Sequence, residues 1–267
     1  MIQNKKIYKK TNRTEKKPRV VKKSPSSVIG GKKPLYPMRI NKYIAHMGIA
    51  SRREADELIE KGKIYVNGVK AELGTQVKKS DIVGLGKDGT IKRETLRYFA
   101  YYKARGITTT KEENSQDILK VTTFPVRVFP VGRLDKDSEG LIIMTNDGRV
   151  TERLLHPRFY HEKEYRAELD HAINNTLLRG LKSGLHVGAF KARPAQVRKY
   201  DEHTIDIILT EGQNRQVRRM VKAFGYNVRS LVRFRIENIE LGDMQSGETR
   251  ELLGEERAEF LKRLGIV

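Results

Sequence analysis

An acidic residue between two apolar stretches is the first candidate for chemistry in this sequence. Asp135 ends the short polar stretch Gly132–Asp135, which follows the apolar run Val128–Val131 and precedes Leu141–Thr145. If both runs are strands, they would hold the carboxylate on a loop supported by rigid elements. The alternative is a turn-capping aspartate, which is the more common role of an isolated Asp. A catalytic role therefore requires companion residues elsewhere in the chain.

Cations at helical spacing supply one possible companion. The apolar residues Val217, Met220, Val221 and Phe224 fall at i, i+3, i+4 and i+7, which predicts a helix over Asn214–Phe224. The cations lie on a second stripe, roughly 200° round that helix, where they could meet phosphate: Arg215, Arg218, Arg219 and Lys222. Arg218 is nearest in angle to the apolar stripe, so we expect it to turn inward toward a carboxylate. A merely solvated charged face is the alternative.

A tyrosine near the start of a predicted strand is the third candidate. Tyr165 belongs to the stretch Lys163–Leu169, whose residues suit a β-strand. Alternation along a strand places Tyr165 and Glu164 on opposite faces. A strand tyrosine is more often part of the core than of a catalytic site, so this residue alone decides nothing.

Several other chemistries are excluded or disfavoured. The chain has no cysteine, which excludes disulfides, thiolate nucleophiles and Cys-ligated metal sites. The stretch from Asp135 begins like a calcium loop, but its twelfth position is Asn146 and not a bidentate Glu. Residues 84–89 match the letters of a dinucleotide fingerprint without a βαβ unit around them. We therefore expect no metal and no cofactor.

The charge balance predicts a polyanionic partner. Lys and Arg number 54 against 33 Asp and Glu, giving a formal net charge of +21. Residues 1–37 are rich in Lys and Pro and poor in large apolar groups, so we expect a disordered tail that either solubilises the protein or binds RNA non-specifically. A membrane surface is the weaker alternative, because the tail lacks an apolar helical face. No signal-peptide core is present, which predicts a cytoplasmic protein.

Residues 38–96 are expected to form a small module and a linker. A helix is predicted from Ile40 to Met47, and Ser51 with Glu54 forms a capping box for a second helix. Asn67-Gly68 is a strong hairpin signal. Cations remain on or beside the helix faces after the apolar stripes are buried: Arg39, Lys42, Arg52 and Arg53.

Residues 97–267 have the pattern of an α+β domain with a mixed or antiparallel sheet, because strands outnumber helices and follow an irregular order. The predicted strands are Arg97–Lys103, Val126–Val131, Leu141–Thr145, Lys163–Leu169, Ala195–Tyr200, Thr204–Leu209 and Val228–Ile236. The predicted helices are Ser115–Lys120, Arg149–Leu155, Asn174–Lys182, Asn214–Phe224 and Glu255–Leu264.

Motifs in both parts resemble a known family. Arg39–Leu85, with Ser51-Arg-Arg-Glu-Ala-Asp56, resembles an S4 RNA-binding domain. Three later motifs resemble those of the RsuA-type pseudouridine synthases: Gly132-Arg-Leu-Asp-Lys-Asp-Ser-Glu-Gly-Leu141, Glu162-Lys-Glu-Tyr165 and Glu211-Gly-Gln-Asn-Arg-Gln-Val-Arg-Arg-Met220. The resemblance implies a small S4 module followed by a mixed-sheet catalytic domain. It also implies that Asp135 is the catalytic aspartate, Tyr165 the aromatic residue beside the target base, and Arg218 the cation paired with the aspartate.

Two local features refine the resemblance. Family members commonly have Lys-Pro-x-Gly after the first strand of the catalytic domain, whereas this chain has Lys103-Ala-Arg-Gly106, so the loop loses the fixed φ of proline. The run Asn214-Arg-Gln216 resembles members that act on large-subunit ribosomal RNA. The implied partner is ribosomal RNA or a pre-ribosomal particle, bound by a monomer.

The implied reaction fits these residues chemically. Turning uridine into pseudouridine gains and loses no atom, so it requires neither cofactor nor redox partner. An ionised Asp135 could face the positive charge that develops on the sugar, and a paired arginine lowers an Asp pKa by about 1–3 units. The base must leave its stack, after which Tyr165 can stack on it. Expected phosphate contacts are Arg133, Arg215, Arg219 and Lys222. The alternative function is a non-catalytic S4-type ribosome-assembly factor.

Overall fold

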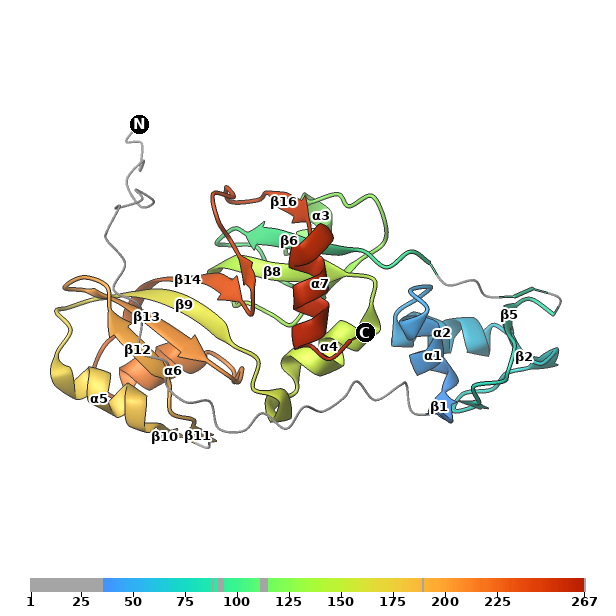
Figure 1. The fold of residues 1–267 in the computed structure, drawn as a ribbon, viewed down its shortest axis with the longest axis horizontal. Helices are drawn as coiled ribbons and strands as arrows, with labels where there is room; N and C mark the ends of the chain where they lie inside the picture. The colour runs from blue at the N-terminus through green and yellow to red at the C-terminus, as the bar shows by residue number, and fades with distance from the viewer. Residues whose placement is uncertain (1–35, 88, 91–93, 111–114, 189, 267) are drawn as a thin grey trace.

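A small N-terminal unit precedes a larger mixed α/β body (Figure 1). The computed structural model describes residues 36–87, 89–90, 94–110, 115–188 and 190–266. The predicted disordered tail, residues 1–37, therefore lies outside the described residues except for its last two positions. The small unit contains β1 (Met38–Arg39), α1 (Ile40–His46), α2 (Arg52–Glu60), β2 (Ile64–Val66), β3 (Val69–Lys70), β4 (Gln76–Val77) and β5 (Val83–Leu85).

Local signals shape this unit as the sequence predicts. The Ser51 hydroxyl accepts a hydrogen bond from the Glu54 amide, and the Glu54 carboxylate accepts one from the Ser51 amide, so the capping box begins α2. Asn67 and Gly68 both have positive φ (51° and 78°), which makes the tight turn between β2 and β3. The unit encloses its own apolar core, formed around residues such as Ile40, Ile44, Ile59 and Ile64.

The larger body is built on a nine-stranded sheet. Its order is β12-β13-β9-β14-β8-β6-β16, with β7 paired to β8 and β15 paired to β14. Only the pair of β14 and β8 is parallel among the described strands of this sheet, so the predicted mixed sheet and α+β class are confirmed. The strands are β6 (Tyr98–Lys103), β7 (Phe129–Val131), β8 (Glu139–Thr145), β9 (Lys163–Leu169), β12 (Gln196–Lys199), β13 (Thr204–Leu209), β14 (Val228–Ile236), β15 (Ile239–Glu240) and β16 (Thr249–Glu251).

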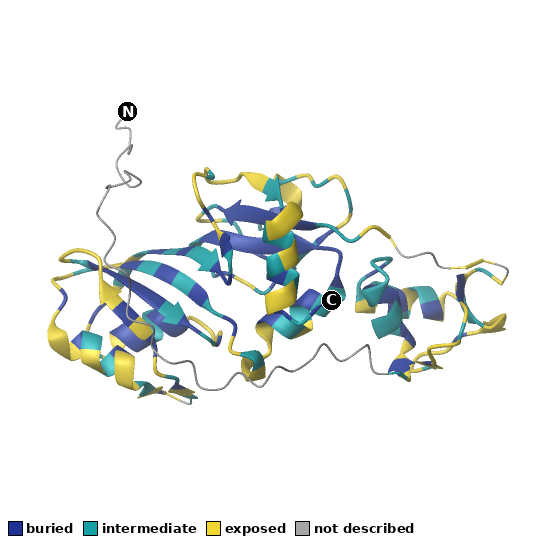
Figure 2. Cartoon of the chain, in the orientation of Figure 1, coloured by how far each residue is buried: buried dark blue, intermediate teal, exposed yellow. Residues whose placement is uncertain are grey.

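Helices cover both faces of the sheet and create two apolar cores (Figure 1). One face packs on α3 (Ile118–Val121), α5 (Asn175–Ser183) and α6 (Gln216–Lys222), and the other on α4 (Gly148–Leu155) and α7 (Gly254–Arg263). Burial on both faces explains why β6 and most of β8 are apolar without alternation. Figure 2 shows the buried residues concentrated along these central strands. A short 3₁₀ helix, Pro157–Phe159, follows α4, and β10 (Leu185–Val187) and β11 (Phe190–Ala192) form a separate hairpin.

Several predicted elements are shorter than expected, among them the helix predicted over Ser115–Lys120, which spans Ile118–Val121, and the strand predicted over Ala195–Tyr200, which spans Gln196–Lys199. The stretch 126–131 forms a strand only from Phe129, because Phe129 already pairs with Thr145, the last residue of β8. The helix predicted from Asn214 begins at Gln216, because Arg215 has a left-handed backbone with φ 50°. No helix in the described ranges is long and apolar enough to cross a membrane.

Polar contacts join the small unit to the body. The Lys42 ammonium lies 3.2 Å from Glu152 of α4, and Arg127 forms an ion pair with Glu54. Within the module and its linker, the Glu94 amide donates to the Met47 carbonyl across 3.2 Å. Lys42, which we expected to bind RNA, therefore already has a carboxylate partner within the protein.

Candidate active site

The loop 132–138 between β7 and β8 presents Asp135. Thr109 fixes this loop from the side: its hydroxyl accepts a hydrogen bond from the Leu134 amide at 3.0 Å and donates one to the Leu134 carbonyl at 2.8 Å. The side chain of Asp135 remains 30% exposed. The loop that carries the aspartate is thus fixed to Thr109 and lies between two strands, as expected, and the Asp135 side chain is still partly exposed.

Asp135 and Tyr165 line the same cavity. The cavity has a volume of about 340 Å³ and is also lined by Lys163, Val217 and Arg233. A second hollow of about 580 Å³, which includes Arg105 and Thr109, also reaches Asp135. The carboxylate therefore lies on a wall shared by the cavity that contains the phenol ring and by an adjoining, larger hollow.

Tyr165 occupies the centre of the sheet on β9. Its cross-strand partners are Ile207 of β13 and Arg233 of β14. The residue is only 9% exposed and belongs to the apolar core, yet it lines the cavity. Glu164 lies on the opposite face, where it accepts a hydrogen bond from Arg235 at 2.7 Å. The predicted alternation is confirmed, and Tyr165 combines core packing with access to the site.

The expected direct pair between Arg218 and Asp135 is wrong in this structure. One terminal nitrogen of Arg218 donates to the Asp137 carbonyl at 3.0 Å and to the Ser138 hydroxyl at 3.2 Å, and the other donates to the Val228 carbonyl at 3.1 Å. Its nearest carboxylate oxygen belongs to Asp137, at 3.4 Å. The side chain does turn inward from α6, but it meets the part of the loop that follows Asp135.

Arg215 takes the place beside the aspartate. It forms two hydrogen bonds of 3.0 Å with the carboxylate of Asp137 and lies 3.8 Å from Asp135. The hydrogen bond from Arg215 lowers the pKa of Asp137. The left-handed backbone of Arg215 explains this position, because it moves the side chain off the helical stripe on which the sequence placed it.

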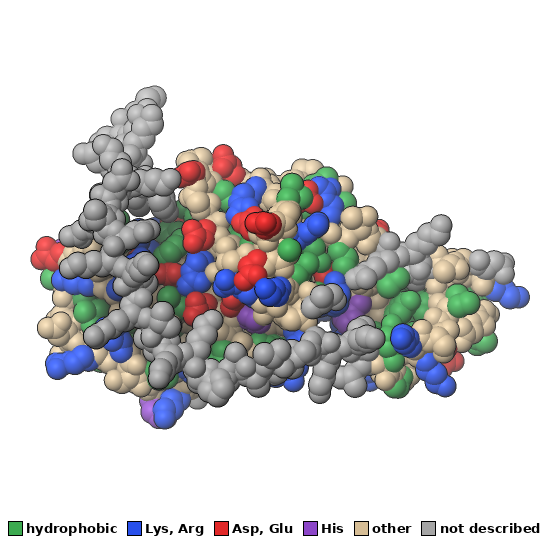
Figure 3. Space-filling model, viewed as in Figure 1, with side chains coloured by type: hydrophobic (Ala, Val, Ile, Leu, Met, Phe, Trp, Pro, Cys, Tyr) green, Lys and Arg blue, Asp and Glu red, His purple; other side chains and the backbone are tan. Residues whose placement is uncertain are grey.

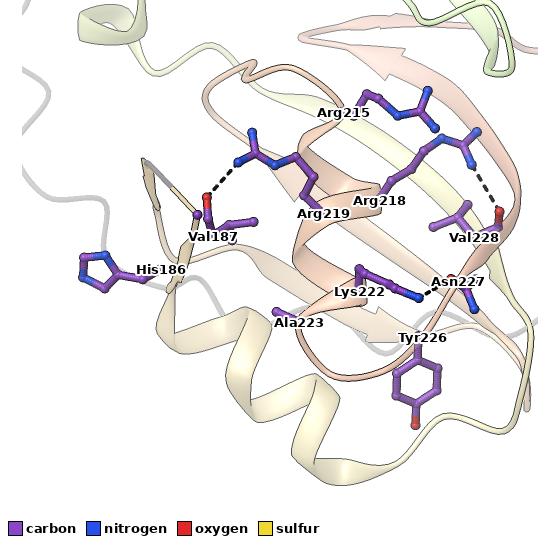
Figure 4. A pocket seen from close by; sticks show the side chains of 11 residues that line it. His186, Val187, Arg215, Arg218, Arg219, Lys222, Ala223, Tyr226, Asn227 and Val228 are labelled. Atoms are coloured by element: carbon purple, nitrogen blue, oxygen red, sulfur yellow. Dashed lines mark hydrogen bonds between the residues drawn. The ribbon is translucent and has the colours of Figure 1, made fainter.

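A basic groove runs along the outer side of α6 (Figure 4). It has a volume of about 580 Å³, and no carboxylate is among its lining residues within the described chain. Arg219 donates to the Val187 carbonyl at 2.9 Å and lies over the Phe190 ring, while Lys222 donates to Asn227 at 2.9 Å. On the face shown in Figure 3, by contrast, cations and acids are mixed over α7, as in the ion pairs of Arg250 with Glu256 and Arg263 with Glu259. The groove therefore has the uniform positive charge that favours phosphate binding, whereas the face shown in Figure 3 does not.

Sequence reasoning missed three buried cations near the site. Lys163 and Arg233 line the cavity with Asp135, and Lys103 is fully buried at the end of β6. Burial lowers the pKa of Lys163 to about 8 and that of Lys103 to about 8. The arginine-rich pattern of 228–236 was visible in the sequence, but the face that each arginine takes depends on a register shift between Arg233 and Arg235.

Two family models match the chain. The S4 domain model matches residues 38–83, and the RNA pseudouridylate synthase model matches residues 97–223. The fold and the site thus define a base-modifying RNA enzyme with an N-terminal S4 module. Curated relatives and a solved structure agree with this class and support the resemblance seen in the sequence.

The chain belongs to the RNA pseudouridylate synthase family and is a pseudouridine synthase. It is 40% identical to the dual-specificity RNA pseudouridine synthase RluF of Escherichia coli (strain K12), over 84% of this chain and 79% of that protein. It is 38% identical to the ribosomal large subunit pseudouridine synthase B of Bacillus subtilis (strain 168), over 80% of this chain and 91% of that protein. A crystal structure of a pseudouridylate synthase superposes with a TM-score of 0.62 at 25% identity, covering 85% of this chain and 99% of that one.

Proposed function

We propose that this synthase isomerises a uridine of large-subunit ribosomal RNA. The observation that carries the chemistry is the shared cavity of Asp135 and Tyr165. The ribosomal substrate is supported by a relative named for the large ribosomal subunit, which is 38% identical. A non-catalytic assembly factor would have no use for an accessible carboxylate beside a buried phenol, so that alternative is set aside.

Asp135 acts on the sugar and Tyr165 on the base. Cleavage of the N1–C1′ bond develops positive charge at C1′, which an ionised carboxylate stabilises or captures. Tyr165 supplies a flat ring on which the extruded uracil stacks, a contact worth about 1–3 kcal/mol per base. Arg218 acts as a positioning residue: its bonds to Asp137 and Ser138 hold the loop that carries Asp135.

The RNA backbone follows the basic surfaces on either side of this cavity. Arg133 lines both hollows that reach Asp135, and Arg219 and Lys222 line the groove along α6. The S4 module provides a second binding surface for the same RNA through its exposed cations Arg39, Arg52 and Arg53. Binding at two surfaces raises the effective concentration of substrate at the cavity. We take residues 38–96 as the S4 module with its linker and residues 97–267 as the catalytic domain, acting as a monomer in the cytoplasm.

The replacement Asp135→Asn tests this function. Tritium release from large-subunit rRNA transcripts labelled at uridine C5 reports the isomerisation directly, because the C5 proton leaves as C5 joins C1′. We expect the variant to release no tritium while its Kd for the transcript stays within about twofold of wild type. Asp243→Asn, an exposed surface control, should release tritium at the wild-type rate.

The comparison of transcripts identifies the substrate. Release from large-subunit but not from small-subunit transcripts supports the proposed RNA. Release by Asp135→Asn at the wild-type rate would remove Asp135 from its role, and release only from small-subunit transcripts would overturn the substrate.

A further inference from the structure

Arg233 is a buried cation with an unused donor at the active-site cavity. Its side chain starts from β14, the residue is only 4% exposed, and it lines the cavity together with Asp135 and Tyr165. Nε donates to the Leu141 carbonyl at 2.8 Å, whereas Nη2 has no hydrogen-bond partner among the described residues. Because a buried donor without a partner is costly, the Arg233 guanidinium has hydrogen-bonding capacity that a ligand in this cavity can satisfy.

The surroundings of Arg233 favour a negatively charged ligand. The guanidinium carbon lies 5.9 Å from the centre of the Tyr165 ring, and no carboxylate within the described part of the chain forms an ion pair with Arg233. Lys163, on the same cavity, directs its ammonium to the carbonyls of Leu154 and His161, at 3.3 and 3.2 Å. The cavity wall also carries the carboxylates of Asp135 and Glu211, but Glu211 is already bound by Arg193 and Gln216. Arg233 is therefore a buried cation without a carboxylate partner among the described residues, an arrangement suited to an anion that appears during the reaction.

The isomerisation itself generates such an anion. When N1–C1′ breaks, both bonding electrons stay on the base, so C1′ becomes electron-poor and the uracil ring carries a negative charge spread over N1 and its two carbonyl oxygens. After the ring turns, C5 uses an electron pair to bond C1′, the C5 proton is lost to solvent, and N1 takes up a proton. No atom is gained or lost in the sum.

We propose that Arg233 is a further catalytic residue, whose guanidinium donates to a carbonyl oxygen of the detached uracil and stabilises its negative charge. This inference rests on the proposed function. Asp135 then faces the positive sugar while Arg233 faces the negative base, so the two halves of the broken bond meet opposite charges. A donor fixed in advance at a developing anion contributes about 10²–10³ in rate.

Neither a phosphate contact nor a purely structural role fits Arg233 as well. Phosphates of a bound RNA remain near solvent, where Arg133 and Arg219 lie, whereas Arg233 is at the centre of the sheet next to a core phenol ring. Arg235, on the other face of the sheet, has its charge paired with the carboxylates of Glu162 and Glu164, whereas Arg233 has no such partner among the described residues.

The test compares uridine with 5-fluorouridine at the target position, under single turnover and saturating enzyme. Fluorine withdraws electrons and stabilises the uracil anion, so a protein donor to that anion becomes less important. We expect Arg233→Gln to consume the uridine substrate about 100-fold more slowly than wild type, and the 5-fluorouridine substrate less than about tenfold more slowly, with Kd changed less than threefold. Arg233→Lys, which keeps the charge, should recover part of the rate. Arg229→Gln, an exposed position on the same strand, is the matched control and should behave as wild type.

The possible outcomes distinguish the role of Arg233 from the proposed function on which it rests. Equal losses with the two bases, or a loss in Kd alone, would assign Arg233 to folding or RNA binding and overturn the inference. The thermal midpoint of Arg233→Gln guards against misfolding, and if that variant fails to fold, Arg233→Lys gives the same comparison of bases. If the wild-type enzyme isomerises uridine and Arg233→Gln does so at the same rate, only the inference is rejected. If the wild-type enzyme leaves every transcript unchanged, the proposed function is rejected.

Discussion

Arg218 binds the active-site loop through Asp137 and not through Asp135. One terminal nitrogen lies 3.0 Å from the Asp137 carbonyl and 3.4 Å from its carboxylate, and the opposite nitrogen reaches the Val228 carbonyl at 3.1 Å. The arginine therefore ties α6 and β14 to the loop that carries the catalytic carboxylate. Arg215 completes the connection with a bidentate bond to Asp137. The position of Asp135 depends on a neighbour two residues further along the chain.

The replacement Asp137→Asn should weaken this connection without removing the chemistry. We expect the turnover rate to fall about tenfold, because the loop loses the ion pairs of Asp137 with Arg215 and Arg218 but keeps the Arg218 bond to the Asp137 carbonyl. A double-mutant cycle with Arg218→Ala, followed by urea unfolding, should give a coupling energy of about 1 kcal/mol. If the two replacements are additive, or if Asp137→Asn is as inactive as Asp135→Asn, Asp137 does not have the positioning role described here.

Gly140 should tolerate no side chain. Its φ of 111° lies in the region that favours glycine, and a Cβ there would overlap main-chain atoms of Arg233 on the neighbouring strand. We expect Gly140→Ala to lower the free energy of unfolding by about 3 kcal/mol or more. Gly212→Ala is the control, since a Cβ at that position meets nothing within 4 Å and should change the free energy by less than about 0.5 kcal/mol. Equal stabilities of the two variants in urea would contradict the close approach of β8 and β14.

Lys163 should make the stability of the protein rise in mild alkali. Burial lowers its pKa to about 8 from an ordinary value of 10.5, so between these values the unfolded chain binds more protons than the folded protein. The free energy of unfolding therefore increases with pH across that window. Lys163→Met removes this contribution, and the gain from pH 8 to pH 10 should shrink by about 1 kcal/mol or more.

Urea unfolding at several pH values checks the role of Lys163. Lys103, whose pKa is also lowered to about 8, keeps its own share of the gain in the Lys163→Met variant. Lys262→Met, with 81% of the lysine side chain exposed, should retain the full wild-type gain. A wild-type stability that stays level from pH 8 to pH 10 would show that neither buried lysine titrates there.

Removal of residues 1–37 tests the role of the basic tail. If these residues bind RNA, the truncated protein binds more weakly, and the slope of log K against log salt becomes shallower by about 0.7 for each phosphate of a single strand that the tail neutralises. Fluorescence titration of a ribosomal transcript at several salt concentrations measures both effects. An unchanged slope would leave the tail with a solubilising role only.

Much of the fold could be predicted because its signals are local. The capping box at Ser51 and the hairpin turn at Asn67 depend on residues at most three positions apart, and both form as predicted. Strands β9, β13 and β14 also have the predicted bounds, since their apolar and branched residues suit a half-buried surface. The strand expected from Val126 failed at its start because a strand also requires a partner, and β8 ends at Thr145.

The sequence by itself determined the order of the elements, the basic charge and the motifs that contain the aspartate, tyrosine and arginine, because each of these depends only on residue types and on residues close together in the chain. Only the tertiary structure decided which of these side chains meet. A bulge in β14 shifts its pairing with β9, so that Arg233 lies opposite Tyr165 and Arg235 lies opposite Glu164. Arginines two positions apart therefore lie on opposite faces of the sheet. The left-handed backbone of Arg215 likewise places its side chain beside Asp137 and Asp135. Arg218, one turn further along α6, contacts the main chain of Asp137 instead. Both shifts arise from long-range pairing and packing, which a periodic pattern along one segment does not contain.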